Sequence, residues 1–147
     1  MIKKQVVAIF FASLFILGGC ASVPMAPESE DMAKKEFNSP ASDKSGIYVF
    51  RNSNFGAALK KSLYIDGKMI GETGPMTYFF REVQAGKHQL STESEFSNNG
   101  LEIDTEGGKN YFVRQFIKFG LVVGGANLEQ VSEEEGKKGV LECKLAK

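Results

Sequence analysis

Few side chains in this sequence could take part in catalysis or bind a metal ion. The 147 residues include a single histidine, His88, and two cysteines, Cys20 and Cys143. A hydrolase needs a base beside a nucleophile, with donors for the developing oxyanion, but no Gly-x-Ser-x-Gly motif surrounds any serine. Structural zinc takes about four ligands, more than one histidine and two cysteines supply. We expect His88 to be a hydrogen-bonded residue at the core edge, and we expect no catalytic residue, metal or cofactor.

Two further patterns have simple structural explanations. Calcium takes about six to eight oxygen ligands from a curved loop, whereas acidic residues that alternate along strands form a flat, solvated face. Cys143 is the one thiol left if Cys20 is modified, and we expect a buried apolar side chain, with an intermolecular disulfide as the alternative. The alternating acidic residues are Glu93, Glu95, Glu102, Asp104 and Glu106.

The strongest chemical pattern lies at the N-terminus. A basic start at residues 1–4 precedes an uncharged, almost wholly apolar run at 6–17, and Gly-Gly-Cys follows at 18–20. This order is typical of a secretory signal, and the apolar run is shorter than the roughly 20 residues that span a bilayer. We predict a signal peptide at residues 1–19.

The sequence Leu17-Gly18-Gly19-Cys20 resembles the lipobox of bacterial lipoproteins. In that family the chain is cleaved just before the cysteine, whose thiol carries a diacylglyceryl group and whose new amino group is acylated, for example with palmitate. The resemblance implies cleavage between Gly19 and Cys20, lipidation of Cys20, and a membrane as partner. An ordinary secreted protein is the alternative. Because Ala21, not an aspartate, follows the cysteine, the resemblance also implies an outer-membrane anchor with the domain in the periplasm, in preference to an inner-membrane anchor.

The composition indicates one folded domain behind this signal. Lys plus Arg and Asp plus Glu both number 18, so no basic excess points to nucleic acid, and a hydrophobic content of 42% is enough for a core. Residues 20–44 hold three of the four prolines and few apolar residues. We predict a lipidated cysteine and flexible tether there, in preference to a helical turn at 32–37, and a folded domain at 45–147.

From residue 45 onward the pattern is that of short β-strands separated by turns. Asp66-Gly67 predicts a hairpin with a type I′ turn, because both central residues of that turn need positive φ. Alternation over residues 88–96 places Leu90 and Phe96 on the side that faces the core. The expected strands cover residues 46–51, 62–65, 68–71, 77–83, 88–96, 101–106, 110–119 and 127–131.

The C-terminus allows two local structures. Ser132 and Glu135 have the spacing of a capping box, which predicts a short helix. The alternative is a final strand with Leu141, Cys143 and Leu145 on one face. Short strands with frequent turns and little helix predict a mainly β fold, a small antiparallel β-sandwich of the PEGA-like or prealbumin-like kind, with the short helix at its C-terminus.

Several of these segments resemble the bacterial domain of unknown function 2846. The similarity extends over roughly Gly46 to Val131, and Ile65-Asp66-Gly67-Lys68 is also similar to PEGA-type surface modules, with Ala85 in place of their usual proline. The resemblance implies a fold, not an activity. We expect a non-enzymatic lipoprotein whose domain binds an envelope protein or glycan or serves as an accessory; an envelope hydrolase or glycan-binding module is the alternative. The matching segments are residues 63–71, 86–90, 107–113 and 128–131.

Overall fold

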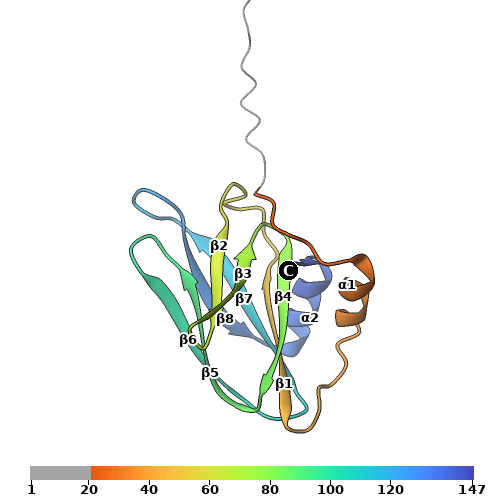
Figure 1. Ribbon diagram of the computed structural model, residues 1–147. Helices are drawn as coiled ribbons and strands as arrows, with labels where there is room; N and C mark the ends of the chain where they lie inside the picture. The colour runs from red at the N-terminus through yellow and green to blue at the C-terminus, as the bar shows by residue number, and fades with distance from the viewer. Residues whose placement is uncertain (1–20) are drawn as a thin grey trace, which may run out of the picture.

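Two β-sheets packed face to face form the body of the protein (Figure 1). This computed structural model describes residues 21–147, so the predicted signal peptide and Cys20 lie outside the described residues. One sheet has five strands in the order β8-β7-β1-β4-β9, and the other has four in the order β3-β2-β5-β6. The elements are α1 (Glu28–Lys34), β1 (Lys44–Arg51), β2 (Lys61–Ile65), β3 (Lys68–Thr73), β4 (Thr77–Gln84), β5 (Gly86–Glu93), β6 (Asn98–Thr105), β7 (Asn110–Lys118), β8 (Gly125–Val131), α2 (Glu133–Leu141) and β9 (Lys144–Leu145).

The sheets confirm the predicted mainly β sandwich, with one refinement. Most neighbouring strands are antiparallel, but β1 pairs with β7 in parallel and β4 pairs with β9 in parallel. Parallel neighbours need a longer crossover than a hairpin provides. Here the chain enters β7 after leaving the opposite sheet at β6 and enters β9 from α2, so neither pair is joined by a tight turn.

The β2–β3 hairpin turns at Asp66-Gly67, as predicted. Asp66 has a φ of 51° and Gly67 a φ of 77°, so both central residues occupy the left-handed region that a type I′ turn requires. A side chain added at Gly67 would meet no atom within 4 Å. The glycine is therefore favoured by its backbone conformation and not by a lack of space.

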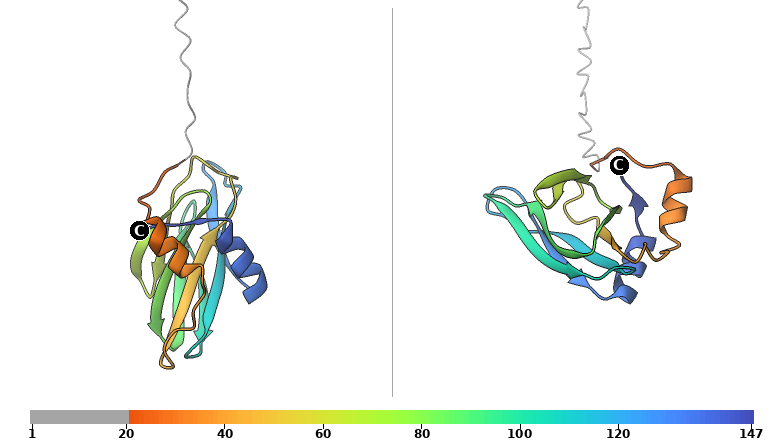
Figure 2. Two further views of the ribbon diagram at one scale, coloured as in Figure 1. Left: turned by 90° about the vertical axis from the view of Figure 1, so that its right-hand side faces the viewer. Right: turned by 60° about the horizontal axis from the view of Figure 1, so that its bottom comes forward.

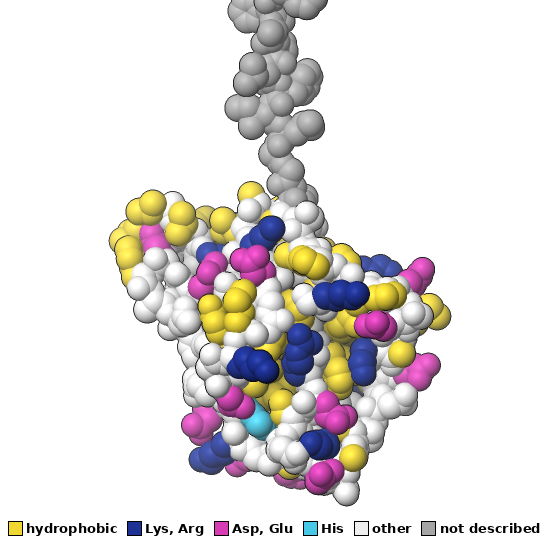
Figure 3. Space-filling model, in the orientation of Figure 1, with side chains coloured by type: hydrophobic (Ala, Val, Ile, Leu, Met, Phe, Trp, Pro, Cys, Tyr) yellow, Lys and Arg dark blue, Asp and Glu magenta, His cyan; other side chains and the backbone are white. Residues whose placement is uncertain are grey.

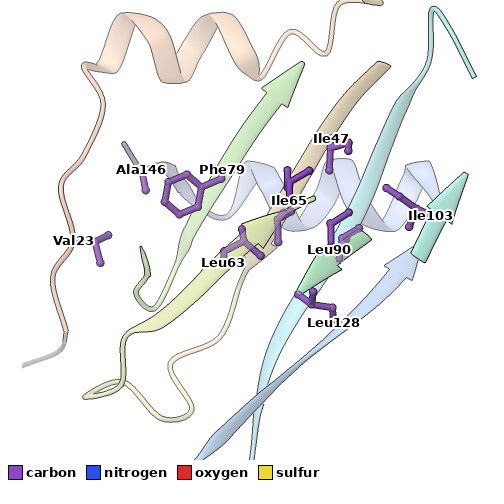
Figure 4. Close-up of a cluster of buried hydrophobic side chains, with 11 residues drawn as sticks. Val23, Ile47, Leu63, Ile65, Phe79, Leu90, Ile103, Leu128 and Ala146 are labelled. Carbon is purple, nitrogen blue, oxygen red and sulfur yellow. The ribbon is translucent and has the colours of Figure 1, made fainter. Parts of the chain in front are cut away.

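The main core fills the space between the sheets (Figure 4). In β1, alternate residues Ile47 and Val49 point into this core, whereas Tyr48 and Phe50 belong to a second cluster on the outer face of the five-stranded sheet. Both faces of β1 are therefore buried, because the helices cover the outer one. The buried members of the main core are Val23, Ile47, Val49, Leu63, Ile65, Phe79, Leu90, Ile103, Val113, Leu128 and Ala146.

Helix α2 lies on the outer face of the five-stranded sheet, on the same side as α1 (Figure 2). Its N-cap is Ser132, whose hydroxyl accepts a hydrogen bond from the Glu135 amide at 3.2 Å, as the capping-box spacing predicts. A methyl group at Gly136 would collide with Phe112, and one at Gly139 with Phe50. The glycines that weaken the helix as an isolated segment thus let it approach the sheet closely. The alternative prediction, a final strand that contains Leu141, Cys143 and Leu145, holds only for the two residues of β9.

The prediction of a flexible tether over residues 20–44 is wrong for the described part of that segment. Val23 is buried in the main core, the Ala26 amide donates to the Leu145 carbonyl at 2.9 Å, and α1 follows. Phe37 packs against Tyr48 with ring centroids 5.4 Å apart. The apolar residues are few, but Val23, Ala26 and Phe37 each pack against the domain, and composition averages do not detect such isolated contacts.

The predicted strand at 88–96 extends too far. β5 ends at Glu93, and the chain turns through residues 94–97 into β6. Leu90 is buried as expected, but Phe96 lies in the turn with 79% of its surface exposed. The period-two pattern continued past the last paired residue, so the inward position predicted for Phe96 is wrong.

Candidate functional site

The described chain begins in contact with the loops at one end of the sandwich. The Ala21 amide donates to the Ala57 carbonyl in the β1–β2 loop at 2.6 Å. A methyl group at Gly74, in the β3–β4 turn, would lie 2.9 Å from the Ala21 carbonyl oxygen. Adjacent Cα atoms are about 3.8 Å apart. Cys20, the predicted site of lipidation and cleavage, is therefore attached one residue away from this end of the domain.

Arg51 holds the loop that receives Ala21. The side chain is fully buried, and its guanidinium donates to the Leu59 carbonyl at 2.7 Å and to the Gly56 carbonyl at 2.8 Å. These carbonyls lie in the loop, outside the sheet ladders, so the guanidinium ties the loop to the end of β1. Sequence reasoning missed this role. The available signal was a charged residue that ends an otherwise apolar strand.

Asp31 fastens α1 to the body of the domain. Its carboxylate accepts hydrogen bonds from the Tyr78 hydroxyl at 2.9 Å, the Leu145 amide at 3.1 Å and the Lys35 ammonium at 3.0 Å. Burial alone would raise the pKa of Asp31, but the bonds from Lys35, Tyr78 and Leu145 outweigh it and lower that pKa. The buried carboxylate therefore stays ionised and joins α1, β4 and β9.

His88 has the structural position that the sequence predicted. It is 9% exposed, its Nδ1 lies 2.7 Å from the Asp66 carboxylate, and its Nε2 lies 2.7 Å from the Gln84 carbonyl oxygen. Since a carbonyl only accepts, Nε2 donates there. Burial lowers the pKa of His88, but the bonds to Asp66 and Gln84 raise it further than burial lowers it. Both ring nitrogens are engaged, so neither is available to take a proton from a nucleophile.

The acidic residues of β5 and β6 do not form a cation site. Along the pair, Lys87 lies opposite Asp104 and Gln89 opposite Glu102, and the Lys87 ammonium is 3.5 Å from the Glu102 carboxylate. Acidic side chains of the two strands therefore do not face each other directly, and Lys87 partly balances their charge. This arrangement avoids the repulsion between like charges on a solvated face. Within residues 21–147 no group of three or more His, Cys, Asp or Glu residues could hold a metal ion.

Cys143 is buried, with 1% of its surface exposed. Burial is the main cause that raises the pKa of its thiol to about 12. Only the thiolate is an effective nucleophile, so this cysteine packs as a small apolar residue in the cluster beneath the helices.

A hollow of about 520 Å³ lies beside the His88–Asp66 pair, between β3 and β4. Ile65, Ile70 and Val83 form part of its apolar lining. Arg81 crosses it, because its guanidinium donates to the Phe80 carbonyl of β4 at 2.7 Å and to the Ile70 carbonyl of β3 at 3.1 Å. The arginine thus bridges the two sheets at this edge of the sandwich.

Sequence comparison places these features in a family. The model described as "Protein of unknown function (DUF2846)" matches residues 41–126, which is more than half of the chain. The chain belongs to the DUF2846 family. The DUF2846 match begins just before β1 and ends in β8, so residues 21–40, α2 and β9 lie outside it.

This DUF2846 protein is also similar to a bacterial protein over most of its own length. An uncharacterized protein of Haemophilus influenzae (strain ATCC 51907 / DSM 11121 / KW20 / Rd) is 56% identical over 131 residues, which cover 89% of this chain and 78% of that protein. No solved structure matches this chain. In residues 21–147, no helix has the length and apolar character needed to cross a bilayer.

Proposed function

We propose that this DUF2846 protein is a bacterial lipoprotein, anchored in the outer membrane through Cys20, whose β-sandwich acts in the periplasm as a non-catalytic binding or accessory domain. The observation that carries the proposal is the lipobox-like sequence Leu17-Gly18-Gly19-Cys20 behind a basic and apolar leader. Ala21, in place of an aspartate, favours the outer membrane.

The position of the cleavage site relative to the folded domain supports this proposal. Cleavage before Cys20 leaves Ala21, Val23 and α1 in the mature chain, and these contribute to the hydrogen bonds and core described above. The proposed processing step thus removes none of the packed residues at 21–147, so the mature domain keeps its contacts.

A non-catalytic role is supported by the state of the reactive side chains among residues 21–147. Both nitrogens of His88 have hydrogen-bond partners, and the Cys143 thiol is buried. A hydrolase needs a free base within reach of a nucleophile. The most reactive groups in this part of the chain instead serve its packing, which favours binding or accessory work.

Metabolic labelling of the full-length chain tests the anchor. Bacteria that express the protein are grown with an alkyne analogue of palmitate, and cell membranes are then separated by density. We expect the wild type and the matched control Cys143→Ala to carry the label and to sediment with the outer membrane, and Cys20→Ser to do neither. An unlabelled wild type, or a labelled Cys20→Ser, would overturn the proposal.

A further inference from the structure

Three loops at the Ala21 end of the sandwich carry exposed apolar side chains. They are the β1–β2 loop at 52–60, the β5–β6 turn at 94–97 and the β7–β8 loop at 119–124 (Figure 1, upper end). Phe119 and Leu121 are each 89% exposed. We call this set the apolar loop cluster, and Figure 3 shows hydrophobic side chains gathered on the loops at the upper left. Its members are Phe55, Phe96, Phe119, Leu121, Val122 and Val123.

Contacts between the loops give the apolar loop cluster a defined shape. The Glu95 carboxylate accepts hydrogen bonds from the Leu121 amide at 2.6 Å, the Val123 amide at 3.3 Å and the Val122 amide. Phe55 and Phe119 meet edge to face, with ring centroids 5.2 Å apart. The backbone donors of the β7–β8 loop are thus satisfied by a neighbouring loop, while the side chains of Leu121 and Val122 project into solvent.

The apolar loop cluster adjoins the point where the lipid would be attached. Ala21 is hydrogen-bonded to Ala57, in the same loop as Phe55. Residues 21–27 continue against the domain through Val23 and Ala26, so no free tether separates the loops from Cys20. A lipid on Cys20 would therefore draw this end of the sandwich, and not its side or its far end, onto the bilayer.

Positive charge at the edge of the apolar loop cluster is also compatible with binding to a membrane. Lys60 and Lys118 are both exposed. Lys60 is the last residue of the β1–β2 loop, and Lys118 immediately precedes the β7–β8 loop. Lysines beside an apolar surface are favoured at membranes that carry anionic phospholipids. The carboxylate of Glu95, in contrast, is occupied by the backbone amides of the β7–β8 loop.

We infer that the apolar loop cluster rests on the membrane and inserts Phe119, Leu121 and Val122 at the boundary between headgroups and acyl chains. This inference depends on the proposed lipidation of Cys20. Exposed apolar patches mark interaction surfaces, and phenylalanine and leucine are common on the buried face of interfacial segments. The lipid on Cys20 would hold this end of the domain at the bilayer, and the loops then add apolar contact with it.

The absence of tryptophan from the sequence allows a direct test. The full-length, lipidated protein is made with Leu121→Trp as the single reporter, with Val122→Trp as a second one, and with Ala85→Trp as the control. Ala85 is an exposed residue that joins β4 to β5. The β4–β5 turn lies at the end of the sandwich opposite to the apolar loop cluster (Figure 1). Each protein is reconstituted into vesicles of phosphatidylethanolamine and phosphatidylglycerol with brominated acyl chains.

We expect blue-shifted tryptophan emission and strong bromine quenching at positions 121 and 122, and neither at position 85. If all three reporters behave alike in protein that carries the fatty-acid label, the inference is overturned while the lipoprotein proposal stands; the loops would then face a protein partner or solvent. If the protein carries no lipid, the proposed function fails and the inference fails with it.

Discussion

At the scale of single residues, polar groups that look reactive in the sequence are used to hold the fold together. His88 and Asp66 illustrate this, because the carboxylate of the hairpin turn accepts from the Gln89 amide at 2.9 Å as well as contacting the imidazole. Burial of Asp66 opposes the lowering of its pKa, but the bonds from His88 and Gln89 produce a net decrease. The pair therefore fixes the β2–β3 hairpin against β5.

This pair should make stability depend on pH. The pKa of His88 is raised above its ordinary 6.5, so its contribution is complete below that pH and is lost as the pH rises through the folded value. We expect the unfolding free energy of residues 21–147 to fall by about 1 kcal/mol above pH 6.5, a modest value because Asp66 is half exposed.

Urea unfolding at about pH 6 and about pH 9 measures this change. The control is Asp66→Asn, since asparagine also tolerates positive φ. The variant should lose most of the dependence in this range, where the only histidine of the chain titrates. Equal dependence in both proteins would show that the ion pair does not stabilise the fold.

The turn itself gives a second prediction at this scale. Gly67→Val places a β-branched residue at a φ of 77°, where the surroundings leave space but the backbone is strained. We expect a loss of about 1–2 kcal/mol and a melting temperature lower by several degrees. Gly67→Asn should melt close to the wild type, because asparagine accepts this conformation. Equal melting of both variants would mean that the turn type does not limit the substitution.

At the scale of elements, the helices contribute through a few specific contacts. α1 has seven residues, too few for a helix to be stable alone in water. Its anchor is Asp31, which is 4% exposed and bonded to β4 and β9 through Tyr78 and Leu145. The segment therefore depends on the domain for its structure, and the domain depends on the segment to cover its outer face.

Removal of this anchor should be costly. Asp31→Ala leaves the buried Tyr78 hydroxyl and Leu145 amide without this acceptor, and an orphaned buried group costs about 1–3 kcal/mol. We expect a total loss of about 2–4 kcal/mol in urea unfolding, with faster amide exchange in α1. Glu30→Ala, on the exposed side of the same helix, should change stability by less than about 0.5 kcal/mol. Similar values for the two variants would contradict the role of Asp31.

Helix α2 offers a test in which two effects oppose each other. Gly136→Ala improves helix propensity by about 1 kcal/mol but places a methyl group against Phe112 at its Cβ, an atom that cannot rotate away. Overpacking typically costs about 1–3 kcal/mol, so we expect a net loss of stability in thermal melting. The exposed Lys138→Ala serves as control and should be nearly neutral. A more stable Gly136→Ala would show that α2 can move away from the sheet.

Much of this element structure follows from the sequence, and the exceptions have physical causes. The alternation of β6 is confirmed by burial of Ile103 and Thr105, and the Ser132 cap by its hydrogen bond. Local patterns specify these features. The docking of α1 was missed because it depends on a buried carboxylate and partners more than 40 residues away in sequence. The exposure of Phe96 was missed because hydrophobic alternation does not mark where pairing ends.

The candidate site was predictable only in part. The character of His88 followed from the lack of catalytic neighbours in the sequence, but its two partners could not be named. Arg51 supports the β1–β2 loop, and through it Ala21, by donating to backbone carbonyls of the loop. Every residue has a backbone carbonyl, so the sequence does not mark which ones accept. The cluster of loops depends on which strand ends the two sheets bring together, and that requires the topology.

At the scale of the whole molecule, the segment that follows Cys20 is packed on the domain, so the proposed lipid on Cys20 would be joined to the sandwich without a free linker. Ala21 is already hydrogen-bonded to the loop end, and α1 and Val23 bind the next residues to the body. Such a protein would work close to the membrane surface. Binding partners would then reach it from the sides of the sandwich or from the end that carries the β4–β5 turn.

Mass spectrometry of the mature N-terminus tests the central claim most directly. The protein is extracted from cell membranes and digested with trypsin, which yields a first peptide from Cys20 to Lys34 if processing occurs as proposed. We predict that this peptide begins at Cys20 and carries a diacylglyceryl group on the thiol and an acyl chain on the amino group. A peptide that begins elsewhere, or that begins at an unmodified Cys20, would contradict the account.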